Sequence, residues 1–236
     1  MNERISIVDV ETSGLIPPGA DEEGTGVCDI SLRFIDKNFR EVNHKHSLIN
    51  PERQISPAST GIHGIYDKDV ENSPTLGDFF KFNNEFKKGT NKVYIVGHNV
   101  RYDWEFIKDY LECEYELVDT LVLAKRYFQG AENYKLQTIR VMAGVHLDLS
   151  DQHSASGDTK TLLNILRVIG KNTGKDALQL CRESNKALPT DPMPIGKYRG
   201  QPIGEIVKND PEYMGWMYNN AERLDQKVKD LIRILL

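Results

Sequence analysis

Two carboxylates follow an apolar run near the N-terminus. In "RISIVDVETSG", residues 4–14, the pattern predicts a β-strand over 5–10 with Asp9 and Glu11 at its end. Side chains alternate along a strand, so both acids share the face of Ile7. Ligands of open α/β sheets bind at the carboxyl ends of the strands. The two acids are therefore candidates for ligand binding or catalysis.

Two further acids stand at the starts of predicted helices. In "RYDWEFIKDYL", Asp103 precedes the apolar residues Phe106 and Ile107 by three and four positions, so it heads the buried stripe of the helix. Asp158 has the same relation to Leu162, four positions later. An acid in a first helical turn also stabilises the helix by interacting with its dipole. Taken singly, either residue could have this structural role instead of a functional one.

Four carboxylates directed at one sheet would repel one another. They would take up protons unless cations neutralised them, and no Lys or Arg neighbours Asp9 and Glu11 in the sequence. Hard divalent ions bound by oxygen ligands solve this problem. Mg²⁺ or Mn²⁺ fits better than zinc, because the group contains no Cys and a single His.

That histidine is His153, in "HSASGD", five residues before Asp158. On one helix the two side chains would point about 140° apart, so both face the site only if His153 lies in the loop before the helix. A histidine with a pKa near its ordinary value of about 6.5 can act as a general base. The alternative is an ordinary surface histidine.

The overall composition is that of a globular protein. The chain has 236 residues, 39% apolar and 28% charged, with a mean hydropathy of -0.50. We expect no membrane partner, since no window is apolar enough for a span. "MNERIS" runs straight into the first strand, which predicts a cytoplasmic protein without a signal peptide. The three cysteines have no metal-site spacing and are expected to be reduced thiols.

Charge is unevenly distributed. The net charge of -5 argues against nonspecific coating of nucleic acid. Residues 160–199, however, carry eight basic residues against three acids. A polyanion could therefore be bound at one place on the molecule.

The order of elements predicts an α/β fold. It is a mixed β-sheet, an antiparallel meander followed by parallel strands, flanked by helices. Strands are expected over 5–10, 27–36, 43–50, 92–99 and 115–120. Helices are expected from Ser73 and Pro74 onward, over 101–112, over 134–144, and from 157 to Gly170 or Gly174.

A proline-rich stretch, "NKALPTDPMPIG", indicates a domain boundary at 185–196. We predict a catalytic domain over 1–175, a helix and linker over 176–192, and a small, mostly helical module over 193–236. About 40 residues are too few for a large independent core.

Three motifs together resemble those of a known family. "DVET" at 9–12, "GHNVRYD" at 97–103 and "HSASGD" at 153–158 are similar, in order and spacing, to the motifs of the DnaQ-like DEDDh 3′–5′ exonucleases. The similarity covers residues 4–172. "PIGKYRGQPIGEIVKNDPEYMGWMYNN" resembles the tail module of the exonuclease X subfamily. The resemblance implies an RNase H-like fold.

The resemblance also implies an activity. Asp9, Glu11, Asp103 and Asp158 would bind two Mg²⁺ or Mn²⁺ ions, and His153 would activate the attacking water. The expected reaction releases nucleoside monophosphates from DNA 3′ ends, single-stranded or frayed from a duplex. Alternatives are an exoribonuclease of the same superfamily, a polymerase-associated proofreading subunit and a noncatalytic nucleic-acid-binding subunit. The complete catalytic set weighs against the last. Oligomeric state is left open.

Five residues are implied as substrate contacts. Thr12 and Gly14 follow the two strand acids in a turn, where the family uses backbone groups to hold the 3′ end. Leu15 would wedge against the last base, or simply pack. His63 matches a position near the substrate, and Asn99 would brace the loop before Asp103.

The sequence departs from the family at two places. "IPPGADEEGTG", residues 16–26, is longer and more acidic than the usual connection. Cys28, Asp29 and Ile30 stand where the family commonly has an Ile-x-Glu stretch. Farther along, "GKYRGQP" places an aromatic residue between cations, which predicts either a second nucleic-acid contact or a structural turn.

Overall fold

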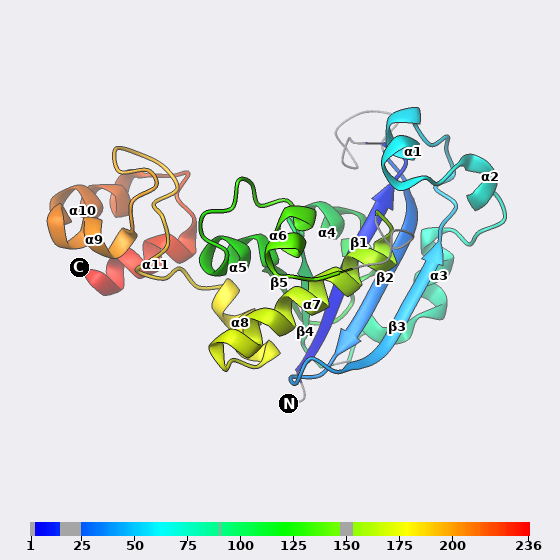
Figure 1. Cartoon of the computed structure of the whole chain (residues 1–236), viewed down its shortest axis with the longest axis horizontal. Coiled ribbons are helices and arrows are strands. Elements are labelled where there is room, and N and C mark those ends of the chain that lie inside the picture. Colours follow the sequence, from blue (N-terminus) through cyan, green and yellow to red (C-terminus); the bar gives the residue numbers. More distant parts are fainter. Residues whose placement is uncertain (1–2, 15–24, 90, 147–152) are drawn as a thin grey trace. The chain divides into compact units, whose positions relative to one another are not determined.

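A computed structural model describes residues 3–14, 25–89, 91–146 and 153–236 (Figure 1). The chain divides into two compact units, Met1–Cys181 and Arg182–Leu236. None of the described helices has the length and apolar character needed to cross a membrane.

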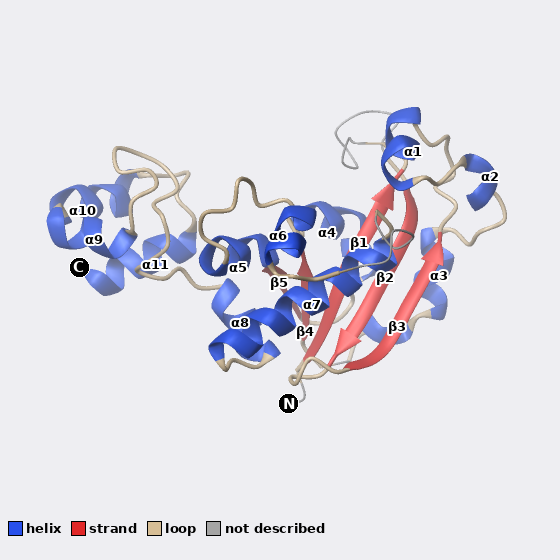
Figure 2. Ribbon diagram, viewed as in Figure 1, coloured by secondary structure: helices blue, strands red, loops and turns tan. Residues whose placement is uncertain are grey.

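The first unit is built on a five-stranded sheet with the order β3-β2-β1-β4-β5 (Figure 2). β1 pairs antiparallel with β2, and β2 antiparallel with β3, whereas β4 is parallel to both β1 and β5. The predicted mixed sheet is therefore confirmed. The strands span Arg4–Thr12 (β1), Val27–Ile35 (β2), Glu41–Leu48 (β3), Val93–Gly97 (β4) and Tyr115–Asp119 (β5).

Helices cover the sheet and complete both units. Those of the first unit are α1 (Pro57–His63), α2 (Asp67–Val70), α3 (Leu76–Phe82), α4 (Arg101–Ile107), α5 (Thr120–Tyr127), α6 (Leu136–Met142) and α7 (Ala155–Thr173). Short 3₁₀ turns lie at Asn84–Phe86 and Lys108–Tyr110, and α8 (Ala177–Ser184) spans the division between the units. The second unit contains α9 (Ile203–Asn209), α10 (Pro211–Asn220) and α11 (Gln226–Leu235).

The alternation of β1 separates two cores. Ile5 and Ile7 belong to the core shared with α7, whereas Val8 and Val10 belong to the core on the opposite face of the sheet. α7 packs along β1 and β2 and buries most of one side of its length. Asp9 and Glu11 continue the face of Ile7, so they lie at the end of the core that α7 covers.

Several helix boundaries differ from the sequence expectation. α3 begins at Leu76, not at Ser73 or Pro74, because the Thr75 hydroxyl accepts the amide of Asp78 at 3.2 Å and caps the helix. α4 ends at Ile107 and tightens into a 3₁₀ turn. α1 is not among the helices predicted from the sequence, although it begins with a serine cap followed by proline, which are typical helix-start residues.

α7 begins two residues earlier than expected. The Ser154 hydroxyl accepts the amide of Gly157, so the helix starts at Ala155. Its end is at Gly174, where a φ of +71° suits glycine, and Gly170 lies inside the helix.

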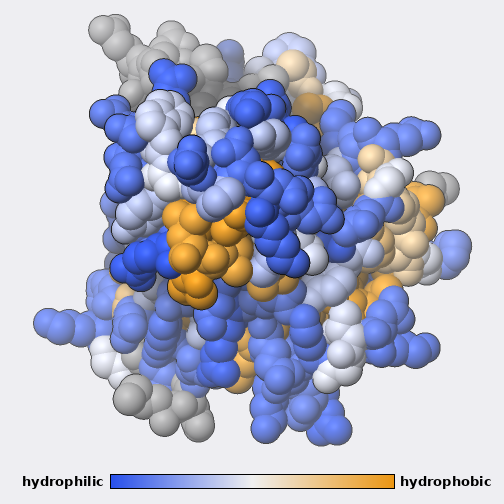
Figure 3. All heavy atoms as spheres, turned by 90° about the vertical axis from the view of Figure 1, so that its left-hand side faces the viewer, coloured by the Kyte–Doolittle hydropathy of each residue, from blue (hydrophilic) through white to orange (hydrophobic). Residues whose placement is uncertain are grey.

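The second unit has its own small core. Met193, Ile203, Met214 and Ile232 are among its buried residues. It also exposes apolar side chains, and Figure 3 shows apolar surface interrupting a largely hydrophilic face.

The aromatic and cationic side chains of "GKYRGQP" contact one another and an acid within this unit. The Tyr198 hydroxyl donates to Asp210 at 2.7 Å, and Lys197 lies 3.3 Å from the same carboxylate and 4.5 Å from the centre of the Tyr198 ring. These contacts favour the structural-turn interpretation of the motif.

Candidate active site

Three carboxylates from two elements meet at the carboxyl end of β1. Asp9 and Glu11 come from the strand, and Asp158 comes from the first turn of α7. Each offers one oxygen, and the three oxygens lie within 4.8 Å of one another. An all-oxygen set of this kind suits a hard divalent cation such as Mg²⁺ or Mn²⁺. These three residues therefore form a candidate metal centre.

Asp103 reaches the same place from α4. Its side chain is buried, and Oδ1 accepts a hydrogen bond from the backbone amide of Val10 at 3.0 Å. That amide lies between the two strand acids. Asp103 is not one of the three clustered residues, but its charge is the largest charge effect on Asp9. The structure thus brings all four predicted acids together, with Asp103 held by the strand backbone.

Burial raises the pKa of all four acids, and neighbouring carboxylates add to the rise for Asp9, Glu11 and Asp103. Burial, followed by the charges of Asp103 and Asp158, raises the pKa of Asp9 well above its ordinary value. Burial is also the main reason that the pKa of Glu11 rises to about 8, that of Asp103 to about 7 and that of Asp158 to about 6. Negative charge is therefore poorly solvated here, and a bound cation would relieve the repulsion.

His153 lies in the turn directly before α7, not on the helix. Its side chain is exposed, and its φ is +56°. Its charge lowers the pKa of Asp158, so the two groups interact. An exposed histidine beside an acidic cluster can exchange protons with solvent, as a general base must.

Two α6 residues that the sequence does not predict as site residues support the cluster, Gln137 by direct contact and Arg140 through Gln137. Gln137 donates from Nε2 to Oδ1 of Asp158 at 2.9 Å, and Arg140 donates from Nε to Oε1 of Gln137 at 2.7 Å. The chain Arg140–Gln137–Asp158 fixes one oxygen of the acid. No local pattern identifies these residues, because a polar face is ordinary on a helix.

The turn after β1 is held by side-chain contacts. The Thr12 hydroxyl donates to the carbonyl of Gly14 at 2.7 Å and lies 2.9 Å from the Tyr102 hydroxyl. His63 lies beside this turn, with Nε2 3.3 Å from the carbonyl of Thr12. Burial lowers the pKa of His63, which favours its neutral form. Leu15 and most of the acidic loop 16–26 lie outside the described residues.

Asn99 acts through its backbone. The residue has a φ of +62°, and its side chain is exposed. Its amide donates to Oδ1 of Asp119 at 2.9 Å, and its carbonyl accepts the amide of Tyr102 at 3.0 Å. The sequence does not predict Asp119 as the hydrogen-bond partner of Asn99. Because it ends β5, its position beside this turn depends on the pairing of β5 with β4.

Sequence comparison finds two families along the chain. A model described as "Exonuclease" matches residues 6–166, and one described as "Exodeoxyribonuclease X-like C-terminal" matches residues 196–222. Exodeoxyribonuclease 10 of Escherichia coli K12 is 26% identical over 233 residues, which is 95% of either chain. A DNA polymerase III subunit epsilon-like protein of Rhodobacter capsulatus is 31% identical over 160 residues, 65% of this chain and 22% of the relative.

Solved structures share the fold. Exonuclease X in complex with 5′-overhanging duplex DNA aligns with a TM-score of 0.59 at 23% identity, covering 76% of this chain and 99% of that one. Exonuclease I of E. coli in complex with a dA16 oligonucleotide aligns with a TM-score of 0.59 at 14% identity, over 77% of this chain and 42% of that one. At these identities the likeness concerns the fold alone.

Proposed function

Since this chain belongs to the exonuclease family, we propose that it is a metal-dependent 3′–5′ exonuclease that releases nucleoside 5′-monophosphates from DNA 3′ ends. The observation that carries the proposal is the convergence of Asp9, Glu11 and Asp158 within 4.8 Å. The family model spans these three residues, so the convergence coincides with the matched region.

The acids and the histidine have different roles in the proposed reaction. Asp9, Glu11 and Asp158 would hold two divalent ions, with Asp103 completing the negative charge beside Asp9. Two such ions, when bound, activate a water nucleophile and stabilise the leaving 3′ oxygen of an in-line displacement. His153 takes the proton of the attacking water and passes it to solvent, because its ring is exposed.

DNA is the proposed substrate for two reasons. The relative that matches 95% of this chain is an exodeoxyribonuclease, and the family model that matches residues 196–222 is described as exodeoxyribonuclease X-like. The turn at Thr12 and Gly14 would hold the 3′ terminus through its backbone, with Leu15 against the last base. His63 contacts that turn through the Thr12 carbonyl. The acids contact phosphate and metal, not the sugar, so an exoribonuclease is the alternative.

A proofreading subunit is the other alternative. The match of residues 196–222 to an exodeoxyribonuclease X-like C-terminal model favours a separate exonuclease. Unassisted digestion by the purified chain would support this choice, whereas digestion only with a polymerase present would contradict it.

The test measures release of the 3′-terminal nucleotide from single-stranded DNA, duplex DNA and RNA of matched sequence. We expect digestion of DNA with Mg²⁺, none with EDTA, and no release above background from Asp9→Ala protein, whose melting temperature should be unchanged. Asp36→Ala, which removes a half-buried acid from the β2–β3 turn away from the cluster, is the control and should retain full activity. Substantial hydrolysis by Asp9→Ala protein would refute the metal assignment. Equal rates on RNA and DNA would refute the DNA preference.

A further inference from the structure

Polar residues line the side of β2 that faces α7. Asp29, Ser31 and Arg33 alternate along the strand and are buried, with exposed fractions of 2%, 0% and 6%. The residues between them, Ile30 and Leu32, point into the apolar core on the other side of the sheet. Burial of an acid is costly unless hydrogen bonds compensate it, so the partners of Asp29 indicate what it does.

Both carboxylate oxygens of Asp29 have partners in the fold. Oδ2 accepts the backbone amide of Ala155 at 3.0 Å, and Oδ1 lies 2.9 Å from Nε2 of His46. Ala155 is the first residue of α7, whose opening amides have no partner within the helix. Asp29 therefore joins the start of α7 to two neighbouring strands.

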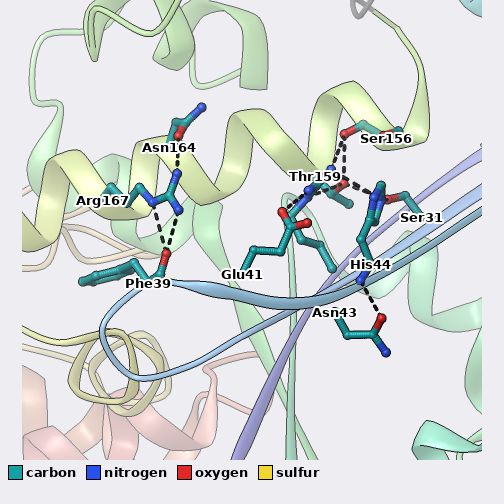
Figure 4. Close-up of polar contacts among 10 residues, drawn as sticks. Ser31, Phe39, Glu41, Asn43, His44, Ser156, Thr159, Asn164 and Arg167 are labelled. Atoms are coloured by element: carbon teal, nitrogen blue, oxygen red, sulfur yellow. Dashed lines mark hydrogen bonds and ion pairs between the residues drawn. The ribbon is translucent and has the colours of Figure 1, made fainter.

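Two more residues near the start of α7, Ser156 and Thr159, contact the same side of β2. Ser31 lies 2.8 Å from the Thr159 hydroxyl, and Arg33 donates to the Ser156 carbonyl at 3.2 Å. Figure 4 shows Ser31 and Thr159 between the strands and the helix, with His44 beside Ser31. Asp29 and Ser31 thus lie beside the acidic cluster, since they pair with Glu11 and Asp9 in the sheet.

Asp29 lies beside Glu11 and at the start of α7, between two residues of the proposed site. In the sheet it pairs directly with Glu11, and its charge contributes to the raised pKa of that acid. Ala155 lies between His153, two residues before, and Asp158, three residues after. A displacement of the Ala155 amide would therefore move the proposed base and a proposed metal ligand together.

We propose that Asp29 is a positioning residue that fixes the start of α7, and with it His153 and Asp158, for the reaction proposed above, on which this inference rests. Its carboxylate acts as a hydrogen-bond acceptor for the Ala155 amide and not as a fifth metal ligand. Groups that orient metal ligands without touching the substrate commonly contribute 10- to 100-fold to metal affinity or activity.

The variants separate the hydrogen bond from the charge. Asp29→Ala removes the acceptor, and kcat is expected to fall by about 10- to 100-fold with KM nearly unchanged. Asp29→Asn keeps a carbonyl oxygen for the Ala155 amide and should restore kcat to within about threefold of the wild type, since only the charge is lost. Asp36→Ala is the matched control, because Asp36 likewise accepts backbone amides, those of Asn38 and Arg40, but lies in the β2–β3 turn. It should leave kcat and exchange near Ala155 unchanged.

Two further measurements do not depend on turnover. Hydrogen exchange of the wild-type protein should show a protected Ala155 amide, and Asp29→Ala should lose that protection while the rest of the sheet keeps it. Mn²⁺ binding by Asp29→Asn should equal that of the wild type, whereas Asp158→Asn should lose it. Rapid exchange of Ala155 in the wild type, or loss of Mn²⁺ binding in Asp29→Asn, would overturn the inference.

The same data separate the two proposals. If the wild-type protein digests none of the labelled substrates, the proposed function fails, while hydrogen exchange still decides whether Asp29 holds α7. If the wild type is active and Asp29→Ala matches it in kcat and in exchange, the positioning role fails and the proposed function stands.

Discussion

The starts of α4 and α7 solve the same problem in different ways. Each presents an acid from its first turn to the end of β1. Asp103 on α4 is held by backbone: the Val10 amide binds its oxygen, and the turn before it is formed by the backbone of Asn99. Asp158 on α7 is held by side chains, namely Gln137 directly and Ser154 and Asp29 through the helix start.

This difference separates stability from activity. A buried amide that loses its acceptor costs free energy, whereas a half-buried acid can be removed without leaving a buried group unpaired. We therefore expect the α4 acid to matter for folding and for turnover, and the α7 acid mainly for turnover. The predictions below test this contrast, from the largest expected effect to the smallest.

Replacement of either acid by alanine should cause the largest loss. We expect kcat to fall more than about a hundredfold for Asp103→Ala and Asp158→Ala, above the usual effect of residues that only orient ligands. Urea unfolding at pH 6 should differ between the two variants. The free energy of unfolding should fall by about 1–3 kcal/mol in Asp103→Ala, because the Val10 amide is left unpaired, and should fall little in Asp158→Ala. Asp103→Asn retains an acceptor and should recover stability without activity. Equal stability losses in the two alanine variants would contradict the contrast.

Gln137→Leu should have an intermediate effect. The change removes the donor to Oδ1 of Asp158 but retains the size of the side chain. We expect kcat or Mg²⁺ affinity to fall by about tenfold, as for other residues that orient a ligand. Steady-state rates across a Mg²⁺ titration provide the measurement. Thr138→Val is the control, because the Thr138 hydroxyl that it removes contacts Asn133 and not Asp158. A wild-type Mg²⁺ profile for Gln137→Leu would show that this hydrogen bond is dispensable.

The stabilising effect of Mg²⁺ should depend on pH. The folded protein raises the pKa of Glu11 to about 8 and that of Asp103 to about 7, so it retains protons that the unfolded chain has released. Without metal, stability from these groups is therefore complete below pH about 4 and declines as pH rises toward 8. A fixed Mg²⁺ concentration, a hundred times the Kd at pH 8, should raise the melting temperature by roughly 5 °C or more at pH 8. The same concentration should raise it much less at pH 5.5, where the carboxylates hold protons. A larger rise at pH 5.5 would contradict the assignment.

Asp119→Ala should produce the smallest effect. Asp119 accepts the amides of Asn99 and Leu121, so its loss weakens the turn before α4 and the cap of α5. We expect destabilisation of about 1 kcal/mol, the usual effect of losing a cap, and a melting temperature lower by about 2–4 °C. Turnover should fall only a fewfold, because the Val10 amide still holds Asp103. A loss of activity as great as that of Asp103→Ala would show that the turn, not the strand, positions this acid.

Local pattern was sufficient for much of the fold. The alternation in β1 correctly separated the face of Ile7 from that of Val8, and all five predicted strands are present. Helix starts were less well predicted, because Ser73 and Thr75 are both acceptable caps by type. Only the observed hydrogen bond of Thr75 distinguishes them.

The polar side of β2 shows where local pattern misleads. Alternating Asp29, Ser31 and Arg33 is typical of a solvent-facing side of a strand, yet α7 buries all three. The partners that compensate this burial include Ala155 and Thr159, well over a hundred residues along the chain. No pattern in β2 alone could identify them.

The sequence by itself determined which residues can do the chemistry, because residue type and strand or helix periodicity are local properties. It placed Asp9 and Glu11 on one face and put Asp103 and Asp158 at helix starts. Only the tertiary structure decided that three of these acids share one centre while Asp103 binds a strand amide. It also decided that Gln137 and Asp29 hold the helix that completes the site. Those outcomes depend on strand order and helix packing, which bring distant residues within hydrogen-bond distance.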